Sequence, residues 1–162
     1  MAVQVSAPAV RLVPVEVDER DAFFAAYEAY SRELEPSDPA HEPTDVAAYR
    51  TAIEDDLSYP DSGRELLWIT LHGARAGFVV LRHLPDWLYP DRMITTIAEF
   101  CVFAPHRRGG VGRAAVLAIL ALERARGTYE VEAGILRDNA PGLAFWAALG
   151  FEVRQAVTAR RP

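Results

Sequence analysis

The spacing of hydrophobic positions predicts helices and strands along the whole chain. Hydrophobic and polar residues alternate over residues 10–17, a pattern that is typical of a half-buried strand. Aromatic side chains then recur at helical spacing, which predicts a helix over residues 18–35. Thr44 is a suitable N-cap for a second helix, which is expected to end near residue 57.

The second half of the chain switches between strand and helix patterns. Residues 65–73 and 74–84 indicate two strands joined by a tight turn at Gly73, as in a β-hairpin. Residues 93–104 are hydrophobic on both faces, which is typical of a central strand that is covered on both sides. The elements expected after it are a helix to about residue 127, a strand at 129–136, a helix at 140–150 and a last strand at 151–159.

This order of elements predicts an α/β fold, a sandwich in which about four helices cover one mixed, mostly antiparallel sheet. The turn-rich connection EPSDPAHEPTD, residues 35–45, is too short to divide the chain into separate units. The 162 residues are 51% hydrophobic and long enough to bury a sizeable core, so one domain over residues 1–162 is expected.

Composition argues against several classes of protein. The single cysteine, Cys101, rules out an internal disulfide, and the four histidines show no metal-ligand spacing, so no metal is expected. A net charge of -6 argues against a nucleic-acid partner. The longest apolar run, residues 114–122, is too short to cross a bilayer, and no secretory signal is evident. We therefore expect a cytoplasmic protein without a membrane partner.

The stretch HRRGGVGR, residues 106–113, places three glycines between an expected strand and an expected helix. A helix that begins there has free N–H groups in its first turn, and with the helix dipole these groups favour a phosphate. Arg107, Arg108 and Arg113 would add charge-assisted contacts. The alternative is a glycine-rich turn that only joins strand to helix. The stretch lacks the Lys-Ser/Thr pair of a P-loop, and its late position does not fit a dinucleotide-binding fold.

The segment RRGGVG at 107–112 resembles the acetyl-CoA pyrophosphate motif of the GNAT superfamily of N-acetyltransferases. A second signature follows in DNAPGLAFWAALGF at 138–151, with Asn139 and, seven residues later, Trp146. The resemblance covers the element order of the whole chain. It implies a sheet whose fourth and fifth strands splay apart, acetyl-CoA as co-substrate, and transfer of its acetyl group to an amine by direct attack.

The family binds the coenzyme along the opening between these two strands and on the glycine loop. The resemblance implies that the backbone N–H of Val102 polarises the thioester carbonyl. It also implies that Asn139 contacts the pantetheine arm or orders its own loop, as a helix-capping residue does. The residues expected to bind the coenzyme are Val102, Arg107, Arg108, Gly109, Gly110, Val111, Gly112, Arg113, Asn139 and Trp146.

Glu99 is the only charged residue in the apolar run 93–104, and it is our candidate for the general base. A carboxylate in a buried strand is costly unless it is paired or faces a wet cleft. Low polarity would raise its pKa toward the range needed to deprotonate an ammonium substrate. The alternative is a carboxylate that merely pairs with a nearby arginine. Strand alternation places Glu99 and Val102 on opposite faces unless a bulge intervenes.

The general acid departs from the family pattern. Many members carry a tyrosine where this chain has Trp146, and an indole N–H does not give up its proton in practice. Trp87 and Tyr89 are candidates for a wall of the acceptor pocket, with ordinary packing of their loop as the alternative. In this family the connection at 33–45 shapes the acceptor site, and its five acidic residues here favour a cationic amine.

The sequence thus favours an acetyl-CoA-dependent N-acetyltransferase that acts on a small-molecule amine. One alternative is the same fold with another acyl donor, or with a peptide or protein amine as acceptor. A second alternative is a catalytically silent CoA-binding module, which Trp146 favours and which Glu99 and the glycine loop oppose. A homodimer is common among relatives, but the sequence marks no interface patch.

Overall fold

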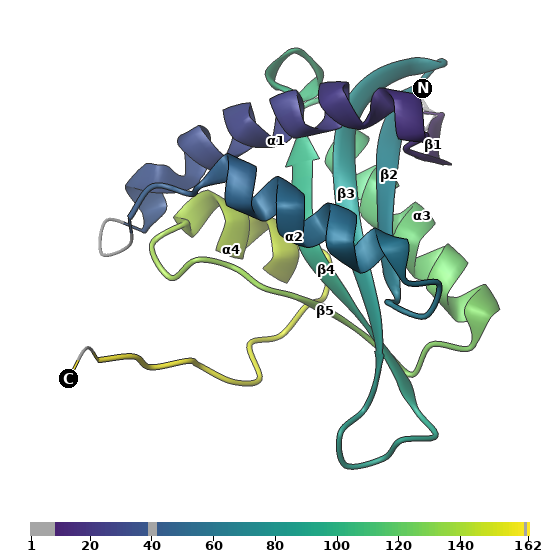
Figure 1. Cartoon of the computed structure of the whole chain (residues 1–162), viewed down its shortest axis with the longest axis vertical. Coiled ribbons are helices and arrows are strands. Elements are labelled where there is room, and N and C mark those ends of the chain that lie inside the picture. Colours follow the sequence, from purple (N-terminus) through teal and green to yellow (C-terminus); the bar gives the residue numbers. More distant parts are fainter. Residues whose placement is uncertain (1–8, 39–41, 161) are drawn as a thin grey trace, which may run out of the picture.

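The computed structural model describes residues 9–38, 42–160 and 162, and shows a five-stranded sheet with helices on both faces (Figure 1). The strands are β1 (Val10–Pro14), β2 (Arg64–Leu71), β3 (Ala74–Pro85), β4 (Met93–Val102) and β5 (Glu130–Ala133). The helices are α1 (Arg20–Leu34), α2 (Val46–Ser58), α3 (Val111–Arg126) and α4 (Ala140–Ala147), with short 3-10 helices η1 (Val17–Glu19), η2 (Glu35–Ser37) and η3 (Ala104–His106). The predicted α/β sandwich is confirmed; residues 39–41 of the turn-rich connection lie outside the described residues.

The strands follow one another across the sheet in the order β1-β2-β3-β4-β5. The first four are antiparallel, and β5 runs parallel to β4. The predicted hairpin joins β2 to β3 through His72 and Gly73, whose φ angles are 51° and 84°. Two consecutive residues with positive φ match the right-handed twist of a hairpin, which explains the glycine at this turn.

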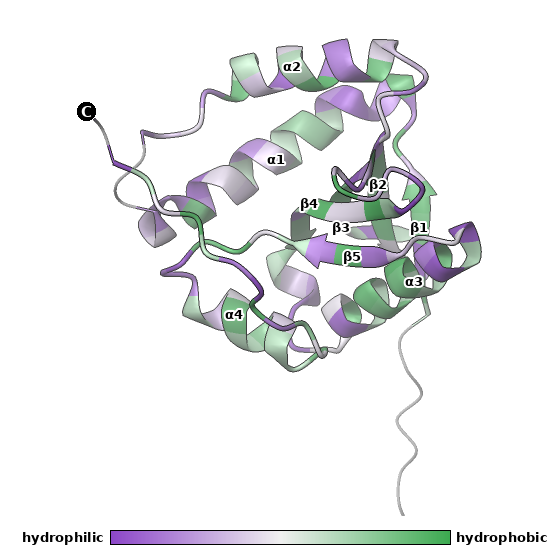
Figure 2. Ribbon diagram, turned by 90° about the horizontal axis from the view of Figure 1, so that it is seen from below, coloured by the Kyte–Doolittle hydropathy of each residue, from purple (hydrophilic) through white to green (hydrophobic). Residues whose placement is uncertain are grey.

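Each face of the sheet carries its own hydrophobic core, with α1 and α2 on one face and α3 and α4 on the other (Figure 2). Alternate residues of a strand point to opposite faces. Leu66 and Trp68 of β2 therefore pack under α1 and α2, whereas Leu67 and Ile69 pack under α3 and α4. This double coverage is the reason why the central strands are hydrophobic on both sides.

The fourth and fifth strands separate, as the family resemblance implies. Only residues 94–97 of β4 pair with β5. Beyond that point β4 continues to Val102, while the chain after β5 leaves the sheet toward α4. Within the part of the chain that the structure describes, no strand therefore pairs with residues 98–102 of β4 on its β5 side.

The prediction of a last strand at 151–159 is wrong, because residues 151–160 form neither helix nor strand. Val153 and Val157 are 81% and 90% exposed, so the hydrophobic side of the alternating pattern is not covered. Alternation stabilises a strand only where a sheet receives its hydrophobic face. Two predicted strands are also too long. The strand predicted over residues 10–17 ends at Pro14, and the strand predicted over residues 129–136 ends at Ala133.

No helix among the described residues has the length and hydrophobicity that a membrane span requires. Within the same residues, no group of three or more His, Cys, Asp or Glu side chains is arranged to hold a metal ion.

Candidate active site

A cleft of about 1430 Å³ opens where β4 and β5 diverge. Its walls come from the end of α1, the second half of β4, the glycine loop with the start of α3, and the segment from β5 into α4. The expected site residues that line it are Glu99, Val102, Arg107, Arg108, Gly110, Gly112, Arg113, Asn139 and Trp146. The expected base and the expected coenzyme loop thus share one cavity.

A β-bulge at Ala98 decides the direction in which Glu99 points. Successive residues of β3 pair with Glu99 and then with Ile97, which leaves Ala98 as an extra residue in β4. Ile97 packs in the α3–α4 core, and Cys101 packs in the α1–α2 core. Because Glu99 alternates with Cys101, the bulge turns its carboxylate to the α1–α2 side of the sheet.

Burial raises the pKa of Glu99 to about 7, although the hydroxyls of Tyr30 and Tyr49 and the charge of Arg64 each act to lower it. Glu99 forms no ion pair with any residue that the structure describes, so a structural arginine pair does not account for it. A carboxyl that titrates near pH 7 has the proton affinity that a general base needs at neutral pH.

Val102 points its side chain to the face opposite Glu99 and offers its backbone to the cleft. The N–H of Phe103 donates to the carbonyl of Ala76 in β3 at 2.8 Å. Successive N–H groups along a strand point to opposite sides, so the N–H of Val102 points away from β3 into the gap. The Val102 carbonyl, on the same open side, accepts a hydrogen bond from Arg107 Nε at 2.7 Å.

The glycine loop turns sharply before α3 begins. Arg108 and Gly110 have φ angles of 64° and 81°, and Gly110 is the N-cap of the 16-residue helix α3 without a side-chain cap. A Cβ placed on Gly109 would meet nothing within 4 Å. The first N–H groups of α3 are therefore accessible, as an anion-binding helix start requires. This geometry fits a diphosphate.

The three arginines of the loop differ in their surroundings. The guanidinium of Arg107 forms a bidentate ion pair with Glu33 of α1, in addition to its hydrogen bond to β4. Arg108 and Arg113 are exposed and form no ion pair among the residues described here. Arg107 thus ties the loop to α1 and β4, and the cations that are available to a ligand are Arg108 and Arg113.

Two further loop positions act through packing. The side chain of Val111 is only 3% exposed and belongs to the α3–α4 core, so any contact with a ligand would use its backbone. A Cβ on Gly112 would lie 3.2 Å from Phe145 Cε2 and 3.5 Å from Val102 Cγ2. The missing side chain allows α3, α4 and β4 to meet at the floor of the cleft.

Asn139 caps the helix that follows it. Its Oδ1 accepts a hydrogen bond from the N–H of Gly142 at 3.0 Å. A Cβ on Gly142 would lie 2.6 Å from Asn139 Nδ2, so glycine leaves the room that this cap occupies. Within the protein, Asn139 therefore acts as a helix-capping residue. It also lines the cleft.

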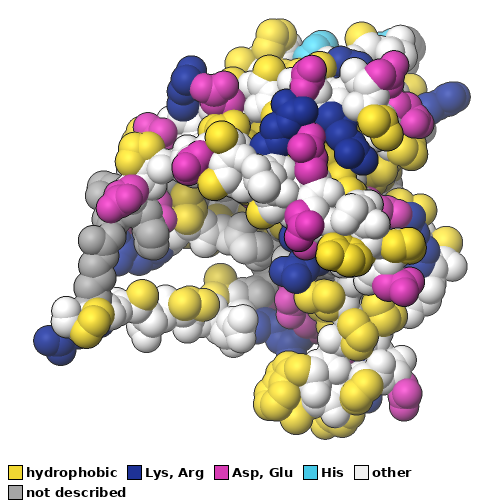
Figure 3. Space-filling model, in the orientation of Figure 1, with side chains coloured by type: hydrophobic (Ala, Val, Ile, Leu, Met, Phe, Trp, Pro, Cys, Tyr) yellow, Lys and Arg dark blue, Asp and Glu magenta, His cyan; other side chains and the backbone are white. Residues whose placement is uncertain are grey.

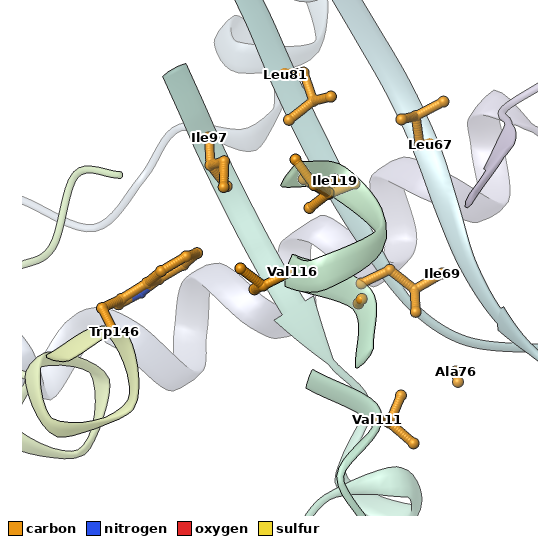
Figure 4. Packing of buried hydrophobic residues seen from close by; sticks show 11 residues of the cluster. Leu67, Ile69, Ala76, Leu81, Ile97, Val111, Val116, Ile119 and Trp146 are labelled. Atoms are coloured by element: carbon orange, nitrogen blue, oxygen red, sulfur yellow. The ribbon is translucent and has the colours of Figure 1, made fainter. Parts of the chain in front are cut away.

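Trp146 extends from α4 toward Val116 in the α3–α4 core (Figure 4). It is 7% exposed, and its ring packs edge-on against Phe100, Phe145 and Phe151 at centroid distances of 5.4, 5.3 and 4.9 Å. Trp146 therefore supports the cleft as a wall residue, and it has no acidic proton to offer.

Trp87 and Tyr89 lie away from the cleft, in the loop between β3 and β4, where hydrophobic side chains gather at the bottom of Figure 3. They are 87% and 54% exposed, and neither lines the cleft. Arg92 lies over the rings of Tyr89 and Tyr129 at 4.3 Å in each case. The structure does not bring these two residues together with Glu99.

The side of the cleft formed by the end of α1 and the connection after it is acidic, and it contains one residue that sequence reasoning missed. Glu33, Glu35, Asp38 and Glu42 line this side. Tyr30 also lines it, with its hydroxyl beside Glu99. The sequence marks Tyr30 only as one of the aromatic residues at helical spacing, and no local pattern indicates that its hydroxyl meets a carboxylate from β4.

A model of the Acetyltransferase (GNAT) family matches residues 23–151, a range that contains β4, the glycine loop and α4. The chain belongs to the GNAT family of acetyltransferases. It is therefore an acyltransferase, and acetyl-CoA is the donor that is typical of this family. No curated protein matches the chain in sequence.

Solved structures share the GNAT fold at low sequence identity. YycN from Bacillus subtilis matches with a TM-score of 0.73 at 16% identity, over 95% of this chain and 99% of its own. Ribosomal-protein-alanine N-acetyltransferase from Brucella melitensis biovar Abortus 2308 matches with a TM-score of 0.71 at 16% identity, over 94% and 99%. An aminoglycoside acetyltransferase from an uncultured soil metagenomic sample, in complex with sisomicin, matches with a TM-score of 0.66 at 12% identity, over 94% and 95%.

Proposed function

We propose that this GNAT protein transfers the acetyl group of acetyl-CoA to an amine of a small molecule, with Glu99 as the general base. The observation that carries the proposal is that a carboxyl with a pKa of about 7 and an open glycine loop line the same cleft. Burial raises the pKa of the Cys101 thiol to about 11, so this residue is a poor nucleophile. Direct attack by the amine fits the site without an acyl-enzyme. One domain over residues 1–162 and a cytoplasmic location stay predictions.

The donor half of the cleft suits an acyl-CoA. The N–H groups at the start of α3, with Arg108 and Arg113, would hold the diphosphate. The N–H of Val102, which points into the gap, would donate a hydrogen bond to the thioester carbonyl. When bound, acetyl-CoA supplies an activated acyl group, and Gly109, Gly110, Val111 and Gly112 would contribute backbone and space rather than charge.

The acceptor half suits a cationic amine. Glu35 and Glu42 line the cleft on this side, at the connection that follows α1. A similar structure holds sisomicin, a ligand of that aminoglycoside acetyltransferase, and another belongs to a ribosomal-protein-alanine N-acetyltransferase. The acidic lining supports a small polycationic acceptor over a peptide N-terminus, which stays the alternative along with another acyl donor.

The second candidate is a silent CoA-binding module, which Trp146 favours because the expected acid is missing. The two candidates differ in turnover. We would measure thiol release from acetyl-CoA with two amines, sisomicin and a peptide that has an N-terminal alanine. We would also measure the rise in melting temperature that acetyl-CoA causes. Acetyl transfer predicts stabilisation and amine-dependent thiol release. Stabilisation without release on any amine supports the module, and no stabilisation at saturating acetyl-CoA contradicts both.

A further inference from the structure

Acetyl transfer needs a proton for the leaving thiolate, and Trp146 cannot provide one. The cleft contains few other side chains with a transferable hydrogen close to β4. The Cys101 thiol, whose pKa burial raises to about 11, points into the α1–α2 core. Tyr27 stacks on Tyr49 with ring centroids 3.8 Å apart and interacts with Glu99 only through charge. Tyr30 is different.

The hydroxyl of Tyr30 lies between two groups of the reaction centre. It contacts the carboxylate of Glu99 and the backbone N–H of Phe100. The ring is held by edge-on packing against Phe78, with centroids 5.5 Å apart at 87°. Tyr30 is also one of the residues that line the cleft, on the side where Glu99 lies.

The contact with Phe100 places this hydroxyl over the path of the thioester. The N–H of Phe103 faces β3, and N–H directions alternate from one residue to the next along a strand. The N–H groups of Val102 and Phe100 therefore both face the gap between β4 and β5. Residues two apart in a strand are separated by roughly 7 Å. A thioester whose carbonyl accepts a hydrogen bond from Val102 would therefore lie on the same open edge of β4, roughly 7 Å along the strand from the Phe100 N–H that the Tyr30 hydroxyl contacts.

We propose that Tyr30 passes a proton from Glu99 to the leaving thiolate, and so does the work that the family's tyrosine would do at position 146. The proposal rests on the proposed acetyl transfer. The neutral amine attacks the carbonyl carbon, its nitrogen forms the new C–N bond, and Glu99 takes one proton from that nitrogen. As the C–S bond breaks, the sulfur takes the Tyr30 proton while Tyr30 takes the proton on Glu99. Amide and thiol leave, and both side chains return to their starting forms.

The two transfers must be coupled. Burial and the charge of Glu99 raise the pKa of Tyr30, so a free tyrosinate in this site is costly. A hydroxyl that receives one proton while it gives up another avoids this charge. Glu99, whose pKa is about 7, holds the amine proton loosely enough to return it to a more basic thiolate.

The test combines single variants, a double variant and a matched control. Tyr30→Phe keeps the ring and removes the hydroxyl, and we expect kcat to fall on the order of 100-fold while KM for acetyl-CoA is unchanged. Because both residues serve one relay, Glu99→Gln with Tyr30→Phe should be no slower than Glu99→Gln alone. Tyr27→Phe, from the same helix, should retain the wild-type kcat.

A second measurement uses the unmodified protein. Single-turnover rates in mixtures of H2O and D2O should depend on the deuterium fraction along a curve, because two protons move in one step, and Tyr30→Phe should lose this curvature. If Tyr30→Phe has the wild-type kcat while Glu99→Gln is inactive, the relay is overturned, but the proposed acetyl transfer with Glu99 as base still stands. A loss of acetyl-CoA binding in Tyr30→Phe, or a linear isotope dependence in the wild type, also overturns it. Absence of thiol release by the wild type with sisomicin and the alanine-terminated peptide removes the relay together with the proposed function.

Discussion

Glu33 of α1 and Arg107 of the glycine loop form a bidentate ion pair across 74 positions of sequence. Because Arg107 also donates to the Val102 carbonyl at 2.7 Å, the pair links α1, the glycine loop and β4. The loop is thus held in position before a ligand arrives, which lowers the entropy cost of binding.

Glu33→Gln should weaken acetyl-CoA binding more than it weakens the fold. The two side chains are 53% and 39% exposed, so the pair itself contributes about 0–1 kcal/mol to folding. Release of the loop should raise the dissociation constant for acetyl-CoA about fivefold, which corresponds to roughly 1 kcal/mol. Calorimetric titration and thermal unfolding separate these effects. Glu28→Gln, which breaks an exposed pair within α1, is the matched control and should leave acetyl-CoA affinity unchanged.

Gly110→Ala and Gly109→Ala should separate backbone strain from ligand access. Gly110 has φ of 81°, where a side chain costs about 1–2 kcal/mol, so Gly110→Ala should lower the free energy of unfolding by that amount. Gly109→Ala adds a methyl group in open space and should leave stability unchanged while it weakens acetyl-CoA binding. Chemical denaturation and calorimetry measure the two quantities. Equal stability losses in both variants would contradict this division of roles.

Asn139→Ala and Gly142→Ala should destabilise α4 by the same route. The first removes the cap on the Gly142 N–H, which costs about 1 kcal/mol. The second displaces the Asn139 amide, because the new Cβ would lie 2.6 Å from its Nδ2. Both changes disrupt the same hydrogen bond, so the double variant should unfold at nearly the same temperature as the less stable of the two single variants. Strictly additive losses would show that the cap is not shared.

Glu99 should make the fold less stable as the pH rises. Its pKa is about 7 in the folded protein against an ordinary value of 4.5, so between these values the native state holds a proton that the unfolded chain has lost. The free energy of unfolding should therefore fall from about pH 4.5 to about pH 7 by up to roughly 3 kcal/mol. Glu99→Gln removes this fall. Denaturation of both proteins at pH 5 and pH 8 checks the prediction, which fails if their pH dependence is the same.

The sequence predicts the layers of this fold well, because periodicity reports directly on burial. The two-sided hydrophobic pattern of residues 93–104 identified the central strand that is observed as β4. The alternation at 151–159 led to a wrong strand prediction, because a strand also needs a sheet edge with which to pair. Val153 and Val157 are instead exposed. Pattern alone carries no information about that edge.

The candidate site was only partly predictable. Glu99 could be found because a single charged residue in an apolar strand is unusual. The glycine loop could be found because its glycines are adjacent in sequence and reflect the local backbone conformation. The Glu33–Arg107 pair and the contact between Tyr30 and Glu99 depend on how α1 crosses β4. Such long-range contacts leave no spacing in the sequence, so only the structure shows them.

The most direct test measures amine-dependent thiol release from acetyl-CoA by the wild type and by Glu99→Gln across pH 5–9, with acetyl-CoA affinity determined by calorimetry for both. We expect the wild-type rate to rise with a midpoint near pH 7, as Glu99 loses its proton. Glu99→Gln should be slower on the order of 100-fold, with unchanged affinity. A Glu99→Gln protein with the wild-type rate and the wild-type pH profile would contradict the assignment of the base.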